Sequence, residues 1–249
     1  MVGYAQHVLT LGEQPTTSDR QEDPSVGEKV SFGAGSEGYL ALPAAGDGPA
    51  VLVIQEWWGL VSHITGLADR FAEAGFVALA PDFYHGENTT EPDEARRLLM
   101  ELALPQAAAD IAGAAAYLRE LPQVTGKVGV VGFCAGGSLA LWSATVAPEQ
   151  IAAVTAFYPG GYTEKLAPQW SAYAGKPVLV HCAEEDGTST APHIQAAVKG
   201  IEAAGGTATV YDYPGTDHAF FNDDRPEHYH REAATLSWAR TLDFFRSTL

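Results

Sequence analysis

Positively charged residues are scarce in this chain. Its 249 residues include 14 Lys and Arg against 31 Asp and Glu, which gives a formal net charge of −17. A surface of that sign repels nucleic acid and anionic membranes, so we expect neither as a partner. It also works against long-range attraction of an anionic substrate, so recognition of such a substrate would have to be local.

Cysteine and long apolar runs are scarce as well. Only two cysteines occur, Cys134 and Cys182, and we expect both to be free thiols rather than a disulfide framework. No run approaches ~18 consecutive apolar residues, the length that a transmembrane helix needs. The N-terminus lacks the basic segment and apolar core of a signal peptide, so we expect a cytoplasmic protein. A monomer and a small homo-oligomer both fit the sequence.

Hydrophobic residues make up 46% of the chain, enough to fill the core of one large domain. Residues 1–35 are polar and lack periodicity, so they are either irregular or a short hairpin. From about residue 38, short apolar runs alternate with amphipathic segments, without a repeat or a linker. This alternation predicts a single α/β domain over residues 1–249, with a mostly parallel sheet and helices on both faces.

Seven apolar runs predict strands, and five amphipathic segments predict helices. The strands are expected at residues 39–42, 50–55, 76–80, 127–132, 152–157, 177–182 and 207–213. The helices are expected at residues 64–74, 93–121, 137–146, 191–204 and 226–249, with Pro92, Pro192 and Pro226 near three of their starts. Parallel strands end at one edge of a sheet, so the loops that follow residues 55, 80, 132, 182 and 213 should converge there.

One of these loops, residues 132–137, reads Gly-Phe-Cys-Ala-Gly-Gly between an apolar run and a helical segment. A strand, a glycine turn and a helix are typical of the nucleophile elbow, in which small residues allow a strained turn that lifts one side chain to the sheet edge. That side chain would be the thiol of Cys134. The alternative is that Cys134 is a packing residue, since free cysteine is among the most buried residue types.

An acid and a histidine follow the later strands in the order that an α/β-hydrolase requires. His218 would take the thiol proton and later protonate the leaving group, while Asp186 would hold the imidazole in the required tautomer. Glu184, Glu185 and Asp217 compete for the acid's role, but Asp186 sits deeper in its turn. A solvated turn residue is the alternative for each.

The loop at residues 55–60, Gln-Glu-Trp-Trp-Gly-Leu, follows the first strand of the parallel part. The backbone N–H groups of Trp57 and Ala135 are our candidates for an oxyanion hole. Glu56 is unusual, since a carboxylate at the end of a buried strand is costly unless it is paired, hydrogen-bonded or protonated. The alternative is an ordinary exposed loop acid.

Four motifs in order resemble the dienelactone hydrolase family, also called carboxymethylenebutenolidase: residues 55–60, 80–84, 132–137 and 218–220. The resemblance covers nearly everything from about residue 38 to the C-terminus. It implies an α/β-hydrolase fold and a Cys-His-Asp triad at Cys134, His218 and Asp186. It also implies hydrolysis of a small unsaturated lactone through an acyl-enzyme, without a metal or an organic cofactor. In the family a glutamate at the position of Glu56 lies beside the thiol and assists its activation.

The resemblance is incomplete in the substrate pocket. The best-characterised members hold the lactone carboxylate with two arginines, and this chain has Gly86 and Asn222 at those positions. Neither replaces the fixed charge and fork geometry of a guanidinium. Arg225 and His85 would compensate if their loops fold inward. For Arg225, surface pairing with one of the two preceding aspartates is the favoured alternative.

Aromatic residues near the strand ends would line the mouth of the site, although such residues more often pack in the core. The substrate-binding candidates are Trp58, Tyr84, His85, Phe220, Asn222 and Arg225. His63 is expected to be a helix cap or to lie behind the pocket, and His181 and Cys182 to lie in the core. His228 and His230 do not face one another on a helix, so no metal site is expected.

The leading interpretation is therefore a cysteine-dependent hydrolase of carboxylic esters or lactones. Because the arginine pair is missing, a general esterase or a thioesterase of the same fold is an alternative. A different class is a non-catalytic or redox-sensing protein, in which Cys134 reacts with peroxide. An ester assay beside intact-mass analysis after peroxide treatment would separate these classes.

Overall fold

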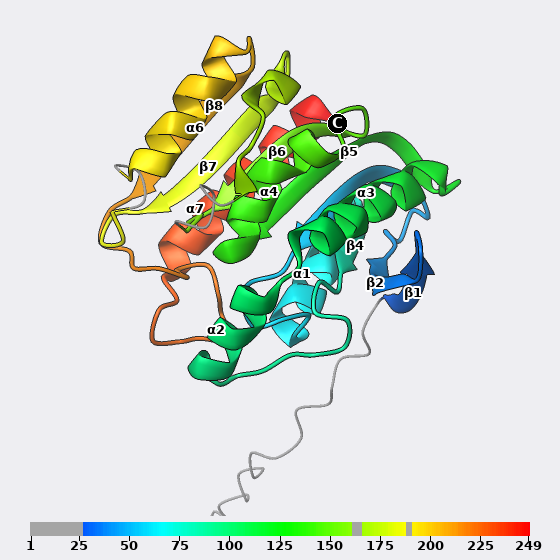
Figure 1. Cartoon of the computed structure of the whole chain (residues 1–249), viewed down its shortest axis with the longest axis horizontal. Coiled ribbons are helices and arrows are strands. Elements are labelled where there is room, and N and C mark those ends of the chain that lie inside the picture. The colour runs from blue at the N-terminus through cyan, green and yellow to red at the C-terminus, as the bar shows by residue number, and fades with distance from the viewer. Residues whose placement is uncertain (1–26, 161–165, 188–190) are drawn as a thin grey trace, which may run out of the picture.

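The computed structural model describes residues 27–160, 166–187 and 191–249. In this part of the chain, the strands form one sheet in the order β1-β2-β4-β3-β5-β6-β7-β8 (Figure 1). Residues 1–26, most of the segment for which the sequence left two alternatives, lie outside the described residues. The strands are β1 (Glu28–Phe32), β2 (Ser36–Ala41), β3 (Gly48–Ile54), β4 (Val77–Pro81), β5 (Val124–Phe133), β6 (Ile151–Phe157), β7 (Pro177–Ala183) and β8 (Thr207–Tyr213).

A hairpin forms one edge of the sheet. β1 pairs with β2 and β2 pairs with β4 in antiparallel fashion, whereas the pairs from β4 to β8 are parallel. The turn between β1 and β2 contains Gly33 and Gly35, both with positive φ, a conformation that glycine adopts without strain. For residues 28–35 the hairpin alternative is therefore correct, and the predicted mostly parallel sheet is confirmed.

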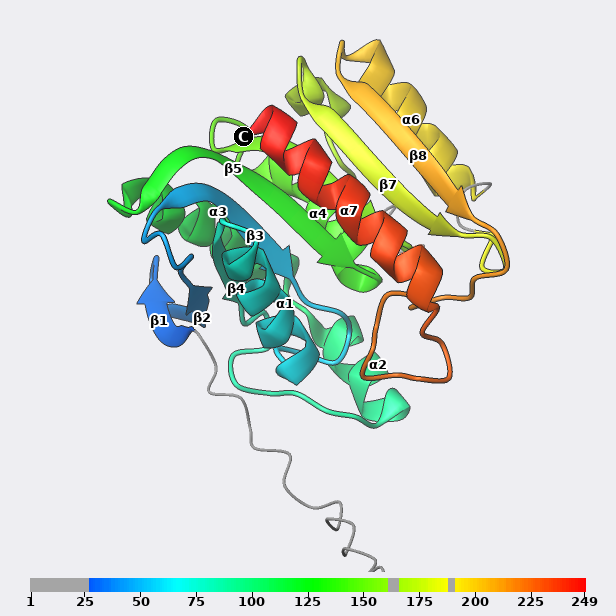
Figure 2. The ribbon, with the colours of Figure 1, turned by 180° about the vertical axis from the view of Figure 1, so that it is seen from behind.

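Helices cover both faces of the sheet. α1 and α7 pack on one face, and α3, α4 and α6 pack on the other, as the two opposite views show (Figure 1, Figure 2). This is the predicted α/β-hydrolase arrangement. The helices are α1 (Ser62–Glu73), α2 (Pro92–Glu101), α3 (Leu104–Glu120), α4 (Ala135–Val146), α6 (Pro192–Ala203) and α7 (Arg231–Thr248), with a 3-10 turn at Trp170–Tyr173.

Side chains of the central strands alternate between two apolar clusters. Leu52 of β3 packs with α3 and α4, whereas its neighbours Val51 and Val53 pack with α1 and α7. All three side chains are fully buried, and each contributes about 1.5–3 kcal/mol by leaving water. A strand buried on both faces appears in the sequence as a continuous apolar run, which is why its position was predictable.

The helix predicted at residues 93–121 is two helices. α2 and α3 meet at an angle of 86°. Pro105 lies in the first turn of α3, where it has no N–H to lose, but a continuous helix would place its ring against the preceding turn. Among the described residues, no single helix is long and apolar enough to cross a membrane. α2 and α3 together have the required length and composition, but they are two helices with a sharp bend between them.

The last helix begins later than predicted. α7 starts at Arg231, five residues after Pro226. The ring of His230 accepts a hydrogen bond from a first-turn amide at 3.3 Å, so it caps the helix. His228 lies 3.0 Å from a carboxylate oxygen of Asp217. Each of the two histidines therefore has a partner of its own.

Main-chain atoms approach one another closely at the start of α4. A Cβ at Gly132 would lie 2.0 Å from the carbonyl oxygen of Gly136, and a Cβ at Gly136 would lie 2.2 Å from that of Gln55. Neither distance leaves room for a side chain. The elbow between β5 and α4 can therefore rest against the end of β3 only because both positions are glycine.

We expect Gly136→Ala to destabilise the fold by about 1–3 kcal/mol or more, because the new methyl group would overlap the Gln55 carbonyl. Gly66→Ala is the matched control. Gly66 lies within α1 with nothing near its missing Cβ, so alanine there should stabilise the protein by about 0.5–1 kcal/mol. Urea unfolding of both variants measures the difference. Equal stability of the two variants would contradict the crowding argument.

Candidate active site

Cys134 lies at the sharp turn between β5 and α4. Its φ of 56° and ψ of −120° form a conformation that residues other than glycine rarely adopt. Two backbone hydrogen bonds hold the turn: the Cys134 amide donates to Phe157 at 3.1 Å, and the Cys134 carbonyl accepts from Gly137 at 3.0 Å. The residue is partly exposed. The turn thus presents a thiol at the sheet edge, as a nucleophile elbow does.

Asp186 holds the imidazole of His218. Its Oδ2 lies 2.7 Å from Nδ1 of the ring. Two competing acids have other partners: Glu184 accepts a backbone hydrogen bond at 2.9 Å, and Asp217 lies 3.0 Å from His228. Asp186, the acid that the sequence analysis favoured, is therefore the one in contact with His218.

The surroundings of His218 favour its protonated form. Burial opposes the charge, but hydrogen bonds and charge interactions with Asp186 and Cys134 outweigh burial and raise the pKa of His218 to about 10. Because Nδ1 is engaged by Asp186, Nε2 is the nitrogen that remains for the thiol. Asp186 therefore binds the imidazole of His218, and His218 and Cys134 line the same cavity.

Glu56 is buried in the same cavity. Only 2% of its surface is exposed, and Nδ2 of Asn222 donates to its Oε2 at 2.7 Å. Burial raises the pKa of Glu56, against the opposing effects of His63 and of the Asn222 hydrogen bond. The alternative of an exposed loop acid is therefore wrong. Asn222, predicted to contact substrate, instead holds this carboxylate.

Two backbone N–H groups adjoin the thiol and the carboxylate. Trp57 follows Glu56, and Ala135 follows Cys134 as the first residue of α4. Within the described part of the chain, neither amide donates a backbone hydrogen bond. The first amides of a helix have no partner inside it, so they are suited to bind a negatively charged oxygen. These two amides are the candidate oxyanion donors.

Arg225 lies in the wall of the cavity. Its guanidinium carbon is 5.0 Å from the centre of the Trp58 ring, and its Nη2 is 3.1 Å from Glu227. Surface pairing with the preceding aspartates is therefore wrong, because Asp223 and Asp224 bind other residues. The cavity has a volume of about 320 Å³ and is lined by Glu56, Trp57, Trp58, Cys134, His218, Ala219 and Arg225.

Trp58 and Arg225 also border a second cavity. It has a volume of about 340 Å³ and includes Asn222 and Thr89 in its lining. The stacked pair is thus a wall that the two cavities share. The guanidinium of Arg225 and the ring of Trp58 therefore lie in the lining of the cavity that contains Cys134.

Tyr84 and His85 lie elsewhere. They line a separate cavity of about 220 Å³ that shares no residue with the cavity at the thiol, and Nε2 of His85 is 3.4 Å from Asp110 of α3. The local turn explains this placement. The carboxylate of Asp82 accepts hydrogen bonds from the amides of Tyr84 and Gly86, which curls the loop towards α3. Their predicted contact with substrate finds no support in this arrangement.

Tyr158 is a site residue that the sequence analysis missed. It follows β6 directly, has a φ of 34°, and its ring centre is 5.0 Å from that of His218. Burial, followed by the charges of Glu56 and Cys134, raises the pKa of Tyr158 well above its ordinary value. Phe220, predicted to contact substrate, is fully buried against Tyr158. The feature of the sequence that could have indicated Tyr158 as a site residue was its position directly after a buried strand.

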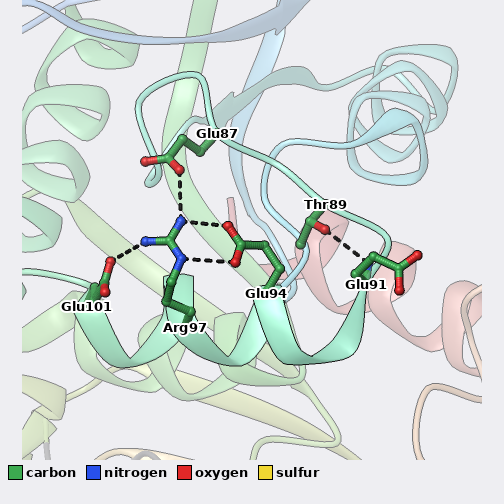
Figure 3. A network of polar contacts seen from close by, with 6 residues as sticks. All are labelled: Glu87, Thr89, Glu91, Glu94, Arg97 and Glu101. Atoms are coloured by element: carbon green, nitrogen blue, oxygen red, sulfur yellow. Dashed lines mark hydrogen bonds and ion pairs between the residues drawn. The ribbon is translucent and has the colours of Figure 1, made fainter.

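The loop after β4 braces the Trp58 side of the site. The Thr89 amide donates to the Trp58 carbonyl at 3.0 Å, and Gly59 forms a β-bridge with Asn88. Arg97 of α2 forms exposed ion pairs, one of them with the same loop, and such pairs contribute little individually. Its partners are Glu87 in the loop and Glu94 and Glu101 in the helix, as Figure 3 shows. The backbone contacts are therefore the stronger support for Trp58.

The model of the dienelactone hydrolase family matches residues 36–249. This chain belongs to that family. Protein usf of Aquifex pyrophilus is 34% identical over 90% of the chain and 100% of the relative. The carboxymethylenebutenolidase of a Pseudomonas species is 32% identical over 86% of the chain and 90% of the relative.

A solved structure from Klebsiella pneumoniae, provisionally named a dienelactone hydrolase, resembles the chain with a TM-score of 0.74. The two are 29% identical, and the match covers 89% of this chain and 98% of that one. As a member of the family, the protein is a hydrolase that acts on ester bonds. The expected resemblance and fold are both confirmed.

We expect His218 to stay protonated at neutral pH and its pKa to fall towards the ordinary value in Cys134→Ala, because this variant lacks the side chain whose hydrogen-bonding and charge interactions help to raise that pKa. Imidazole NMR titrations of both proteins measure the shift. His181 is an internal control, because burial lowers its pKa to about 3 and keeps it neutral in both proteins. An unchanged His218 titration in the variant would contradict the coupling.

Proposed function

We propose that this protein hydrolyses a small ester or lactone through a Cys134–His218–Asp186 triad and a thioester acyl-enzyme. The observation that carries the proposal is the hydrogen bond between Asp186 and His218 at the cavity that His218 and Cys134 line together. Two free amides beside the thiol support it, since they are placed to bind an oxyanion. Membership of the family supports ester chemistry.

The first half of the reaction would form the acyl-enzyme. Nε2 of His218 takes the proton of Cys134 before the attack, so the imidazole is already protonated when Sγ of Cys134 attacks the carbonyl carbon. The carbonyl oxygen becomes an oxyanion, to which the amides of Trp57 and Ala135 donate. When the carbonyl re-forms, the C–O bond breaks and His218 gives its proton to the departing oxygen. In a lactone, that oxygen stays on the same molecule.

The second half would release the product. His218, now neutral, accepts a proton from water, and the resulting hydroxide attacks the thioester carbon. The second oxyanion collapses, the C–S bond breaks, and the proton returns to Sγ of Cys134. Asp186 keeps the imidazole oriented in both halves and stabilises its charged form. The cycle consumes one water and leaves every group as it began.

Glu56 would assist the first half as a second acceptor for the thiol proton. It lines the same cavity as Cys134, and its carboxylate is otherwise bound by a single amide. Burying a carboxylate costs free energy, so the burial of Glu56 suggests that it has a function. Accepting the proton of the Cys134 thiol would be that function.

Arg225 would bind a carboxylate or another acceptor group of the substrate. Among the described residues that line the cavity, Arg225 is the positively charged side chain apart from His218. The family's arginine positions hold Gly86 and Asn222, and Asn222 is engaged with Glu56. Glu227 offsets part of the Arg225 charge, which favours a second candidate function, hydrolysis of neutral esters or thioesters.

We expect Cys134→Ala to lower kcat/KM for a dienelactone or an activated aryl ester by at least about a thousandfold. Cys182→Ala is the matched control, because Cys182 is buried in β7 and burial raises its pKa to about 12. That variant should keep its turnover. Hydrolysis unchanged in Cys134→Ala would overturn the proposal.

The choice of acid is tested in the same assay. Asp186→Asn should lower kcat by roughly 10²–10⁴-fold, because an amide does not stabilise the charged imidazole. Glu184→Gln changes a carboxylate that accepts a hydrogen bond from the Gly215 amide, and this variant should retain turnover. Greater loss in Glu184→Gln than in Asp186→Asn would reassign the acid.

We expect Arg225→Gln to lower kcat/KM for a carboxylate-bearing lactone about tenfold more than for a neutral ester of similar size. The reason is loss of the charged donor in the cavity wall. Kinetics of both substrates with the wild type and the variant measure it. A wild type that prefers neutral esters, with equal losses in the variant, would support the second candidate.

A redox-sensing role for Cys134 remains the alternative of another class. Intact-mass analysis after peroxide treatment, beside the ester assay, separates the two. Oxidation at Cys134 in a protein that hydrolyses no ester would support the sensor.

A further inference from the structure

The cavity of about 340 Å³ that borders Trp58 and Arg225 has no part in the steps of the proposed reaction. The cavity at the thiol has a volume of about 320 Å³, and both volumes are near the lower end of the range for small-molecule sites. The Trp58 ring and the Arg225 guanidinium belong to the lining of both cavities. A substrate with two parts can therefore occupy both, with one part in each cavity.

Three segments build the second cavity: residues 58–63 after β3, 89–92 after β4 and 222–227 after β8. The first and the third also contribute to the cavity at the thiol. Backbone contacts attach the middle segment to the first, because the Thr89 amide donates to the Trp58 carbonyl at 3.0 Å and Asn88 forms a β-bridge with Gly59. Within the middle segment, the Thr89 hydroxyl accepts a hydrogen bond from the Glu91 amide, as Figure 3 shows. The second cavity is therefore held by the same group of loops as the thiol.

The lining of the second cavity combines hydrogen-bond acceptors with donors. Asp224 and Glu227 contribute carboxylates, Arg225 contributes a guanidinium, and Ser62 and Thr90 contribute hydroxyls. The two carboxylates disfavour an anionic group, and the guanidinium disfavours a cationic one. A hydroxyl group is neutral and both donates and accepts, so it can pair with every member of this set.

His63 adds a buried imidazole to the same lining. Only 2% of its side chain is exposed, and Nδ1 lies 3.3 Å from Oδ1 of Asp223. Nε2 is buried and has no hydrogen-bond partner among the described residues, which costs free energy. A hydroxyl group can pair with an imidazole nitrogen whether or not that nitrogen carries a proton. The N-cap of α1 is Val61, so His63 is not the helix cap that was one of its two expected roles.

We propose that the second cavity binds a hydroxyl-bearing part of the substrate. The inference rests on the proposed hydrolysis at Cys134, and it specifies the substrate as an ester with two parts. One part lies at the thiol, and the other carries at least one hydroxyl group and lies beyond the Trp58 ring. Its hydroxyl groups donate to the carboxylates of Asp224 and Glu227 and accept from the guanidinium of Arg225.

The hydroxyl-bearing part belongs either to the alcohol or to the acyl group, and two pairs of esters separate these cases. Propyl butyrate and glyceryl monobutyrate differ only in hydroxyl groups on the alcohol. Ethyl butyrate and ethyl β-hydroxybutyrate differ only in a hydroxyl group on the acyl part. For one of the two pairs, the wild type should show a kcat/KM about tenfold higher for the hydroxyl-bearing ester, because new hydrogen bonds form in the second cavity. Rates of alkaline hydrolysis correct this ratio for the intrinsic reactivity of each ester.

A variant that fills the second cavity tests the location. Thr90 lines the second cavity and is absent from the lining of the cavity at the thiol. Thr90→Phe should therefore abolish the preference for the hydroxyl-bearing ester and leave kcat/KM for its unsubstituted partner unchanged. Thr207→Phe is the matched control, because Thr207 is exposed in β8 and lines neither cavity. This control should keep the preference.

The chemistry of the lining is tested by Asp224→Asn. This change keeps the size of the side chain and replaces one acceptor oxygen with a donor, at a carboxylate whose Oδ2 is 3.3 Å from the Ser62 hydroxyl. The preference for the hydroxyl-bearing ester should fall, whereas kcat/KM for the unsubstituted ester should not. Circular dichroism and thermal unfolding show whether each variant is folded.

A binding measurement makes the test independent of turnover. Saturation-transfer NMR follows glyceryl monobutyrate and ethyl β-hydroxybutyrate with Cys134→Ala. Protons of the hydroxyl-bearing part of one ester should receive saturation from this protein, and should lose it when Thr90→Phe is added.

The absence of a preference in both pairs of esters would overturn the inference, as would a preference that a folded Thr90→Phe retains. If the wild type hydrolyses no ester, the proposed function fails and the NMR measurement alone decides the binding site. Equal saturation with and without Thr90→Phe would then overturn the assignment of the second cavity.

Discussion

The site depends on a contact between main chains at the elbow. At Gly132 and Gly136, backbone atoms of the elbow and of the end of β3 come so close that no Cβ fits. This contact fixes the thiol of Cys134 relative to Glu56, the residue directly after Gln55. A side chain at Gly136 would separate the two loops, and one at Gly132 would collide with the carbonyl of Gly136 within the elbow. Cys134, Glu56 and Trp57 line one cavity because the glycines let those loops touch.

The second constraint is electrostatic, because a strongly acidic chain buries a further carboxylate at the centre of its site. Burial raises the pKa of Glu56, and the fold opposes this through His63, the Asn222 amide, His218 and Arg225. Arg225 lines the cavity that holds this group. Long-range attraction of an anion is unfavourable at a net charge of −17, so the local placement of Arg225 matters more than the total number of cations.

Much of the fold and the order of Cys134, Asp186 and His218 after their strands could be predicted from the sequence. Strands buried on both faces are continuous apolar runs, and β8 begins and ends where the sequence predicted. The break between α2 and α3 could have been predicted too, since Pro105 disfavours one long helix. Tyr84 and His85 were harder to place, because the turn at Asp82 decides which way their loop folds.

The sequence by itself determined the α/β fold, the glycine elbow at Cys134 and the positions of Asp186 and His218 after the successive strands β7 and β8, because apolar periodicity and turn chemistry are local properties. The tertiary structure decided which side chains meet. Asn222 binds Glu56 across 166 residues, and Arg225 stacks on Trp58 instead of pairing with an aspartate. Such contacts depend on how loops from distant strands fold over one another, and no local pattern specifies that.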